Sequence, residues 1–160
     1  NPRVLKSLYM GDGELEMRNN LLQKKYRIMK NNDVRFESYY AEDSEVLVVA
    51  CGIVARIALS SVMKLRREGF KMGLFRPVTL FPFPEKEISL LSGKNRQFIT
   101  IEMNAGQMVE DVRLSVNGRS EVLFYGRPGG AVITPEEVQE KILELCNCRN
   151  HFIKTELNVS

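Results

Sequence analysis

The sequence predicts an α/β domain in which helices cover both faces of a mostly parallel, five-stranded sheet. Strand and helix alternate four times from residue 45 onward, and right-handed crossovers make such strands parallel. The first of these strands, residues 45–50, is a continuous apolar run, which is typical of strands buried on both faces. Residues 34–40 alternate more and indicate an edge strand that can run antiparallel. The expected architecture therefore has three layers: helices, sheet and helices.

The order of elements follows from apolar patterns and from signals at the helix ends. The expected strands are residues 45–50, 71–75, 97–103 and 121–125. The expected helices are residues 53–67, residues 84–91, a segment that Asn104 caps, and a segment from Thr134 to about Cys146. Gly69 fits the C′ position of the first of these helices. Thr134 begins a capping box with a proline at the first helical position, which is the clearest helix start in the chain.

Residues 11–32 begin with Gly-Asp-Gly and end with Asn-Asn, the two motifs that hold Mg²⁺ and diphosphate in thiamine diphosphate enzymes. In such a site the Asp and the Asn ligate one cation, and a helix and a second strand separate them. Residues 14–30 instead predict a single helix, with Asp12 as its N-cap. One face of this helix is apolar and contains Leu15, Leu22, Tyr26 and Met29. We therefore expect a capped amphipathic helix rather than a metal site.

Composition narrows the class of protein. The chain has 160 residues, of which 44% are hydrophobic, enough for one globular core. It has 23 basic and 20 acidic residues without a long run of one sign, which argues against nucleic acid or a membrane surface as the main partner. No segment resembles a signal peptide or a membrane span, and three cysteines are too few for a disulfide framework, so a cytoplasmic location is expected. The chain begins at Asn1, so it is either processed or a piece of something longer.

The sequence offers few catalytic groups. His151 is the single histidine and follows the last expected helix, which excludes a histidine base in the body of the fold. No Cys-x-x-Cys sequence occurs, so the usual thiolate framework of an iron-sulfur cluster is missing. Cys146, Cys148 and His151 could contribute to a soft-metal site, or they could be two ordinary thiols and a surface histidine. We prefer the second interpretation because one ligand is missing.

In open α/β sheets, ligands bind beyond the carboxyl ends of the strands. The residues expected at this rim are Cys51, Gly52, Arg76, Pro77, Glu102, Asn104, Gln107, Gly126, Arg127, Gly129 and Gly130. They form neither the three-glycine dinucleotide fingerprint nor a phosphate-binding loop with its lysine and hydroxyl. The rim is therefore polar and rich in glycine, but it does not predict a nucleotide site.

Arg76, Arg127 and Cys51 are the rim residues whose side chains could take part in binding or catalysis. The two arginines could bind acidic neighbours, a substrate carboxylate or CoA phosphate, or a partner subunit, and plain surface charges remain an equal alternative. Cys51 could be a nucleophile below a helix N-terminus. Because no base lies near it in the sequence, we prefer a packing role for Cys51.

Several segments of the chain carry a family resemblance. They are EDSEVLVVACGIVARIALSSVMKLRREGFKMGLFRPVTLFPFPEKEI, EMNAGQMVEDVRLSVNG and FYGRPGG, with PRVLKSLYM and the KYR helix before them. Together they resemble the C-terminal region of the α-type subunit of 2-oxoacid:ferredoxin oxidoreductases, in particular those acting on branched-chain acids such as 3-methyl-2-oxobutanoate (2-ketoisovalerate). The similarity covers residues 3 to about 145.

The resemblance implies a transketolase C-terminal-like domain at residues 41–146, after a linker with a helix and an edge strand at residues 1–40 and before a tail at residues 147–160. The family uses thiamine diphosphate, Mg²⁺, iron-sulfur clusters and CoA to convert a 2-oxoacid to its acyl-CoA, and it passes electrons to ferredoxin. An N-terminal thiamine-pyrimidine domain and other subunits hold these cofactors. No catalytic, cofactor-binding or metal-binding residue is therefore carried over to this chain.

What the resemblance does carry over is contact with neighbouring domains or subunits in an oligomeric complex. The expected interface residues are Gly52, Arg76, Pro77, Glu102, Asn104, Gln107, Asp111, Arg113, Arg127 and Gly129. The main hypothesis is an assembly domain that is inactive alone. One alternative is a regulatory module that binds a small anion or CoA near Arg76 and Arg127. A free-standing enzyme that uses Cys51 is the other.

Overall fold

A computed structural model describes residues 6, 8–93 and 95–146. The strands are β1 (Phe36–Tyr39), β2 (Val46–Val49), β3 (Met72–Pro77), β4 (Gln97–Glu102) and β5 (Glu121–Gly126). They form one sheet in the order β1-β3-β2-β4-β5. Strand β1 pairs antiparallel with β3, and the other three pairs of neighbouring strands are parallel. The predicted mostly parallel sheet with one antiparallel edge strand is confirmed.

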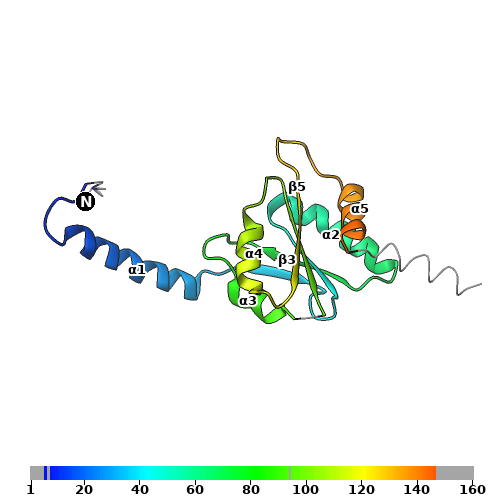
Figure 1. Cartoon of the computed structure of the whole chain (residues 1–160), viewed down its shortest axis with the longest axis horizontal. Helices are drawn as coiled ribbons and strands as arrows, with labels where there is room; N and C mark the ends of the chain where they lie inside the picture. The colour runs from blue at the N-terminus through cyan, green and yellow to red at the C-terminus, as the bar shows by residue number, and fades with distance from the viewer. Residues whose placement is uncertain (1–5, 7, 94, 147–160) are drawn as a thin grey trace, which may run out of the picture.

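Helices cover the sheet on both faces (Figure 1). The helices are α1 (Glu14–Asn32), α2 (Gly52–Arg67), α3 (Glu85–Leu91), α4 (Met108–Val116) and α5 (Pro135–Leu145). One face packs against α2 and α5, and the other packs against α3 and α4. The three-layer arrangement predicted from the alternating elements is therefore confirmed.

The central strands bury side chains on both faces because their apolar runs are continuous. In β2, Val46 and Val48 belong to the cluster under α2 and α5, whereas Leu47 and Val49 belong to the cluster under α3 and α4. All four residues are buried. Successive side chains of a strand point to opposite faces, so one short apolar segment supplies both halves of the core.

Two of the helix-end signals act as the sequence predicts. After α2, Gly69 has a φ of 94°, its N–H donates to Arg66 O at 3.0 Å, and the N–H of Phe70 donates to Leu65 O at 3.1 Å. These bonds form a Schellman motif with Gly69 at C′. At the start of α5, Thr134 Oγ1 accepts from the N–H of Glu137 at 3.2 Å. Both predicted helix ends are confirmed.

Two boundaries differ from the predictions. Strand β3 continues through Arg76 and Pro77, which were expected to begin a connection, because β1 pairs alongside both residues. Helix α4 begins at Met108 with Gln107 as its N-cap, so the prediction that Asn104 caps this helix is wrong. Asn104 Oδ1 instead accepts from the N–H of Gly106 at 2.7 Å and holds the loop before the helix.

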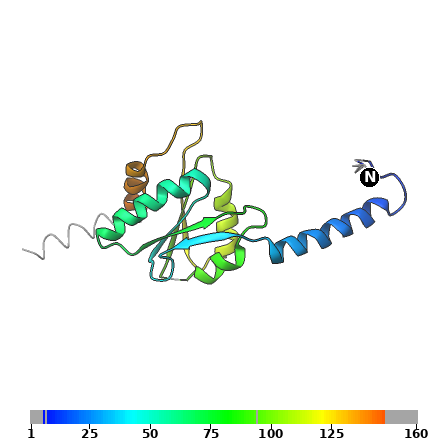
Figure 2. The same cartoon turned by 180° about the vertical axis from the view of Figure 1, so that it is seen from behind.

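Helix α1 extends away from the sheet as a single long helix (Figure 1 and Figure 2). The absence of a second strand between Asp12 and Asn31 is confirmed, and these residues lie at opposite ends of α1. Asp12 is not the N-cap, because Gly13 occupies that position without a side-chain cap. Glu14 instead accepts from the N–H of Gly11 at 3.2 Å. The predicted domain boundary at residue 40 stays a prediction, although β1 pairs within the same sheet.

Candidate functional site

The predicted rim lies at the carboxyl ends of the strands, and its centre lies between β2 and β4. These neighbouring strands continue in opposite directions, because β2 leads through α2 to β3 and β4 leads through α4 to β5. Such a switch point is the usual ligand crevice of an open α/β sheet. Cys51 and Gly52 follow β2 at this point, and Glu102 ends β4.

Glu102 lies at this switch point, at the end of β4. Its side chain is buried, with 5% of the residue exposed, and its carboxylate accepts from the N–H groups of Met108 and Val109 at 2.9 Å each. The N–H of Gln107 lies 3.3 Å from both carboxylate oxygens, and Asn104 Nδ2 donates at 3.1 Å. Glu102 therefore satisfies the first N–H groups of α4, which a helix start otherwise leaves open.

This contact determines the electrostatics at the start of α4. The N-terminus of a helix attracts an anion, and here the chain's own carboxylate takes that position. An anionic ligand at α4 would therefore have to displace Glu102 or lie beside its negative charge.

Cys51 lies at the same place, as the residue before α2, and it packs against the apolar cluster under α3 and α4. Burial raises the pKa of its thiol, and the negative charge of Glu102 raises it further. Both effects favour the neutral thiol over the thiolate that a nucleophile requires. The structure therefore favours the packing role over the catalytic one.

Arg76 is engaged by the edge strand. It lies opposite Glu37 in the register of β1 and β3, and its guanidinium donates to Glu37 Oε2 at 2.9 Å. The hydroxyl of Tyr39 donates to the same carboxylate at 3.0 Å, and this hydrogen bond is the main reason that the pKa of Tyr39 is raised. Pro77, the next predicted interface residue, is buried at the end of β3.

Arg127 is engaged by helix α5. Its guanidinium and the hydroxyl of Tyr125 both donate to the carboxylate of Glu137, and the N–H of Arg127 donates to Glu102 O at 3.0 Å. The hydrogen bond from Tyr125 is the largest of the effects that lower the pKa of Glu137, and Arg127 adds to it. Burial, followed by the contact with Glu137, raises the pKa of Tyr125.

The other predicted interface residues lie on the surface around this centre. Gly52, Gln107, Asp111, Arg113 and Gly129 are all exposed. Arg113 pairs with Glu110 within α4. Although the residue is exposed, partial desolvation of its carboxyl raises the pKa of Asp111, and the negative charges of Glu85, Glu102 and Glu110 raise it further. The structure thus brings Glu102, Asn104 and Gln107 together, whereas Arg76 and Arg127 belong to two separate ion pairs.

Three important rim residues were absent from the sequence-based prediction: Glu37, Tyr125 and Glu137. The sequence identified Glu137 only as part of a helix start. In the structure, Glu137 lies in the first turn of α5, which follows the loop after β5, and this position brings its carboxylate to Arg127. Glu37 carried no local signal, because its pairing with Arg76 spans 39 residues and requires the β1–β3 register.

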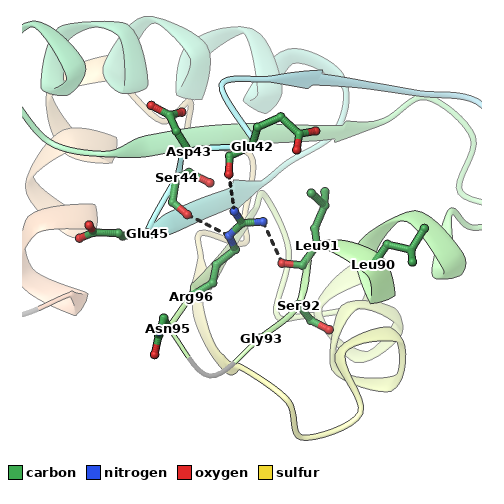
Figure 3. A pocket seen from close by; sticks show the side chains of 10 residues that line it. All are labelled: Glu42, Asp43, Ser44, Glu45, Leu90, Leu91, Ser92, Gly93, Asn95 and Arg96. Atoms are coloured by element: carbon green, nitrogen blue, oxygen red, sulfur yellow. Dashed lines mark hydrogen bonds between the residues drawn. The ribbon is translucent and has the colours of Figure 1, made fainter.

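A hollow of about 510 Å³ lies at the opposite end of the sheet from the rim, where β2 and β4 begin (Figure 3). The guanidinium of Arg96 points into it and donates to three backbone carbonyls, those of Ser44 at 2.9 Å, Leu91 at 2.8 Å and Glu42 at 3.2 Å. Glu42 and Ser44 belong to the connection between β1 and β2, and Leu91 ends α3, so Arg96 ties that connection to the end of the helix. Its donors serve the fold rather than a ligand.

Metal ligands are a further requirement for several kinds of catalysis. Among residues 6, 8–93 and 95–146, no group of three or more His, Cys, Asp or Glu side chains is placed to hold a metal ion. The suggested group of Cys146, Cys148 and His151 falls partly outside these residues, because the last two are not described. Within the same part of the chain, every helix is too short or too polar to cross a bilayer.

The sheet order, its antiparallel edge and its two helical layers define a transketolase-like α/β domain. A solved split-gene transketolase, an inactive β4 tetramer, aligns with 69% of this chain and 40% of its own, at a TM-score of 0.54 and 19% identity. A 2-oxoglutarate:ferredoxin oxidoreductase from Magnetococcus marinus, solved with 2-oxoglutarate, coenzyme A and succinyl-CoA, aligns with 86% of this chain and 24% of its own. Its TM-score is 0.65 at 18% identity. Both likenesses show the fold, and the predicted fold class is confirmed.

Sequence comparison gives the family. Residues 44–138 match the pyruvate:ferredoxin oxidoreductase core domain II, and the chain belongs to this family. The ketoisovalerate oxidoreductase subunit VorB of Methanothermobacter thermautotrophicus is 42% identical over 142 residues, which are 89% of this chain and 40% of that subunit. VorB of Methanothermobacter marburgensis is 40% identical over 147 residues, 92% of this chain and 42% of that subunit. The resemblance to 2-oxoacid:ferredoxin oxidoreductases is thereby confirmed.

The relatives are considerably longer than this sequence. The chain spans about two fifths of the length of either VorB subunit. The 2-oxoglutarate synthase subunit KorA of Methanothermobacter marburgensis is 30% identical over 119 residues, which are 73% of this chain and 32% of that subunit. The similar region is therefore one part of each of these larger enzyme subunits.

Replacing Glu102 with alanine is expected to lower the free energy of unfolding by about 2–4 kcal/mol, because buried N–H groups of α4 lose a charged acceptor. Urea unfolding measures this loss. Gln107→Ala is the matched control, because the exposed side chain leaves while the backbone N–H stays, and a change within about 0.5 kcal/mol is expected. Equal stability of the two variants would contradict the capping role of Glu102.

The lowered pKa of Glu137 makes its contribution to stability depend on pH. Because the native pKa lies below the ordinary value of 4.5, the stabilisation is fully present above that value and is lost as pH falls through the native pKa. Glu137→Gln should therefore be less stable than the wild type at pH 7, and the difference should shrink as pH falls below 4.5 and through the native pKa. Urea unfolding across this range tests the effect, with the exposed neighbour Glu136→Gln as control. A difference that does not vary with pH would refute it.

Proposed function

We propose that this chain is an assembly domain of a thiamine diphosphate-dependent 2-oxoacid:ferredoxin oxidoreductase. In the proposed reaction, the complete complex decarboxylates and oxidises a 2-oxoacid, forms its acyl-CoA and passes the electrons to ferredoxin. The similarity to two ketoisovalerate oxidoreductase subunits over about nine tenths of the chain carries this proposal and favours a branched-chain acid as substrate.

The chemistry of the rim supports an assembly role for this part of the enzyme. Glu102 is committed to the start of α4, and Arg76 and Arg127 are committed to Glu37 and Glu137. Thiamine diphosphate, Mg²⁺ and the iron-sulfur clusters would accordingly be held by a thiamine-pyrimidine domain and by other subunits. The exposed rim residues Gly52, Gln107, Asp111, Arg113 and Gly129 are then free to contact those neighbours.

A regulatory site for CoA or another small anion near Arg76 and Arg127 has less support. Each guanidinium already faces a carboxylate of the same chain, so an anion would have to replace Glu37 or Glu137. The attraction between each guanidinium and its carboxylate partner opposes that exchange. A free-standing enzyme that uses Cys51 has still less support, since both burial and Glu102 disfavour its thiolate.

The first test of the proposed function is an activity measurement. The purified 160-residue chain should form no acyl-CoA from 3-methyl-2-oxobutanoate, CoA and oxidised ferredoxin. The complete subunit, combined with its partner subunits and thiamine diphosphate, should form it. Acyl-CoA formation by the isolated chain would refute the assembly role, and a fully assembled complex without activity on any 2-oxoacid would refute the assigned reaction.

A second test addresses the rim as an interface. Gln107→Arg should reduce recovery of the partner subunits with an affinity-tagged subunit by about tenfold, since a long charged side chain at an interface costs at least about 1.4 kcal/mol. Ser60→Arg, on the exposed side of α2 away from the rim, is the matched control and should leave recovery unchanged. Equal recovery with both variants would show that the rim around Gln107 is not an interface.

A further inference from the structure

Helix α1 is unusual because it is long, apolar in part and yet uncovered. It has 19 residues and none of them is buried, and it extends away from the sheet (Figure 1 and Figure 2). Helices in proteins gain most of their stability from packing of an apolar face rather than from helix propensity, and they normally bury one apolar stripe. The exposed apolar side chains of α1 are Leu15 at 54%, Met17 at 64%, Leu21 at 53%, Tyr26 at 37% and Ile28 at 61%.

These side chains form two stripes rather than one. At 3.6 residues per turn, Leu15, Leu22, Tyr26 and Met29 lie along one line of the helix, and Met17, Leu21 and Ile28 lie along a second line about 130° away. The first line is the apolar face predicted from the sequence. Two apolar stripes on one helix indicate that a polypeptide packed on α1 contacts more than one side of it.

The base of α1 is attached to the sheet domain. The ring of Tyr26 packs edge-on against Phe81 with centroids 5.7 Å apart, and Lys30 lies 3.9 Å from Glu85. Phe81 belongs to the loop after β3, in which Val78, Leu80 and Phe81 are 48%, 53% and 57% exposed. The Tyr26–Phe81 contact joins this loop to α1. We define the α1 surface as these three loop residues with the five exposed apolar residues of α1.

The charges around the α1 surface indicate the chemistry of what covers it. Helix α1 carries five basic side chains against two acidic ones, Glu14 and Glu16. Pairing of α1 with a second copy of itself would bring two basic surfaces together, which like-charge repulsion opposes. An apolar face with an acidic border fits better, and contiguous exposed apolar residues on a soluble domain mark such contacts.

We propose that the α1 surface is the docking site for the part of the longer subunit that lies outside this sequence. This inference rests on the proposed function, in which the chain is one domain of a larger enzyme. About three fifths of each VorB subunit lies outside the region of similarity. In those subunits, this remaining polypeptide is large enough to cover a surface of this size.

The geometry explains why that body would meet α1. The far end of α1 lies about 28 Å from its base, since 19 residues rise by 1.5 Å each. A polypeptide joined ahead of residue 6 would begin at this far end, beside Leu15 and Met17. The covalent link raises its effective concentration at the α1 surface, so the contact needs no strong affinity of its own.

Hydrogen exchange tests this inference. The experiment compares the 160-residue chain with the complete subunit expressed from its gene. Amides of residues 16–25 should exchange about a hundredfold more slowly in the complete subunit, because a packed helix opens far less often than an uncovered one. Amides of α2, which is packed in both proteins, should be unchanged. Equal exchange of α1 in both proteins would overturn the inference.

Matched variants separate docking from folding. In the complete subunit, Leu21→Lys and Ile28→Lys should each abolish most of the added protection of α1, whereas Leu114→Lys, at a 77% exposed position on α4, should not. Protection of α1 in the isolated chain that rises with concentration, together with a dimeric mass, would instead assign the surface to a second copy and overturn the proposal.

Failure of the docking inference can be distinguished from failure of the proposed function. An active complex in which α1 exchanges freely would overturn the docking inference alone. A protected α1 in a complete complex without 2-oxoacid oxidation would overturn the proposed function and leave the docking site in place.

Discussion

The hydrogen bonds between the Glu102 carboxylate and the start of α4 are the contacts on which the rim depends. They join the end of the central strand β4 to the first N–H groups of the helix that follows it. The backbone of the same residue accepts from Arg127, which ties the end of β5 to the same point. Gly126 lies so close that an added Cβ would be 2.4 Å from Asn104 O. The side chain and the backbone oxygen of Glu102 together thus join two strand ends and one helix start.

This arrangement has a functional consequence. Many α/β proteins leave the N-terminus of a helix at the switch point open, and a phosphate or carboxylate of the ligand binds there. Here a side chain of the protein takes the place of that anion, and the two nearby arginines have carboxylate partners of their own. The rim keeps exposed polar residues at its border, which suits contact between domains. This arrangement agrees with the proposed assembly role, because fold alone does not determine function and the site residues decide it.

The sequence predicted the parts of the fold that depend on local patterns. The apolar run of β2, the Schellman glycine Gly69 and the Thr134 capping box each need only their own neighbours. It failed where a longer contact competed with a local preference. Asn104 is a good N-cap residue, yet the carboxylate of Glu102 takes the α4 N–H groups and leaves Asn104 in the loop. The Arg76–Glu37 pair was also inaccessible, because only the register of β1 against β3 brings these residues together.

Carboxylates of this chain already pair with the α4 N-terminus, Arg76 and Arg127 at the rim. Titration calorimetry of the purified chain with CoA, and separately with thiamine diphosphate and Mg²⁺, tests whether a ligand can take their place. No saturable heat is expected with either. A saturable heat of one equivalent that Arg127→Ala weakens would contradict this expectation, because it would show that the guanidinium exchanges Glu137 for a ligand.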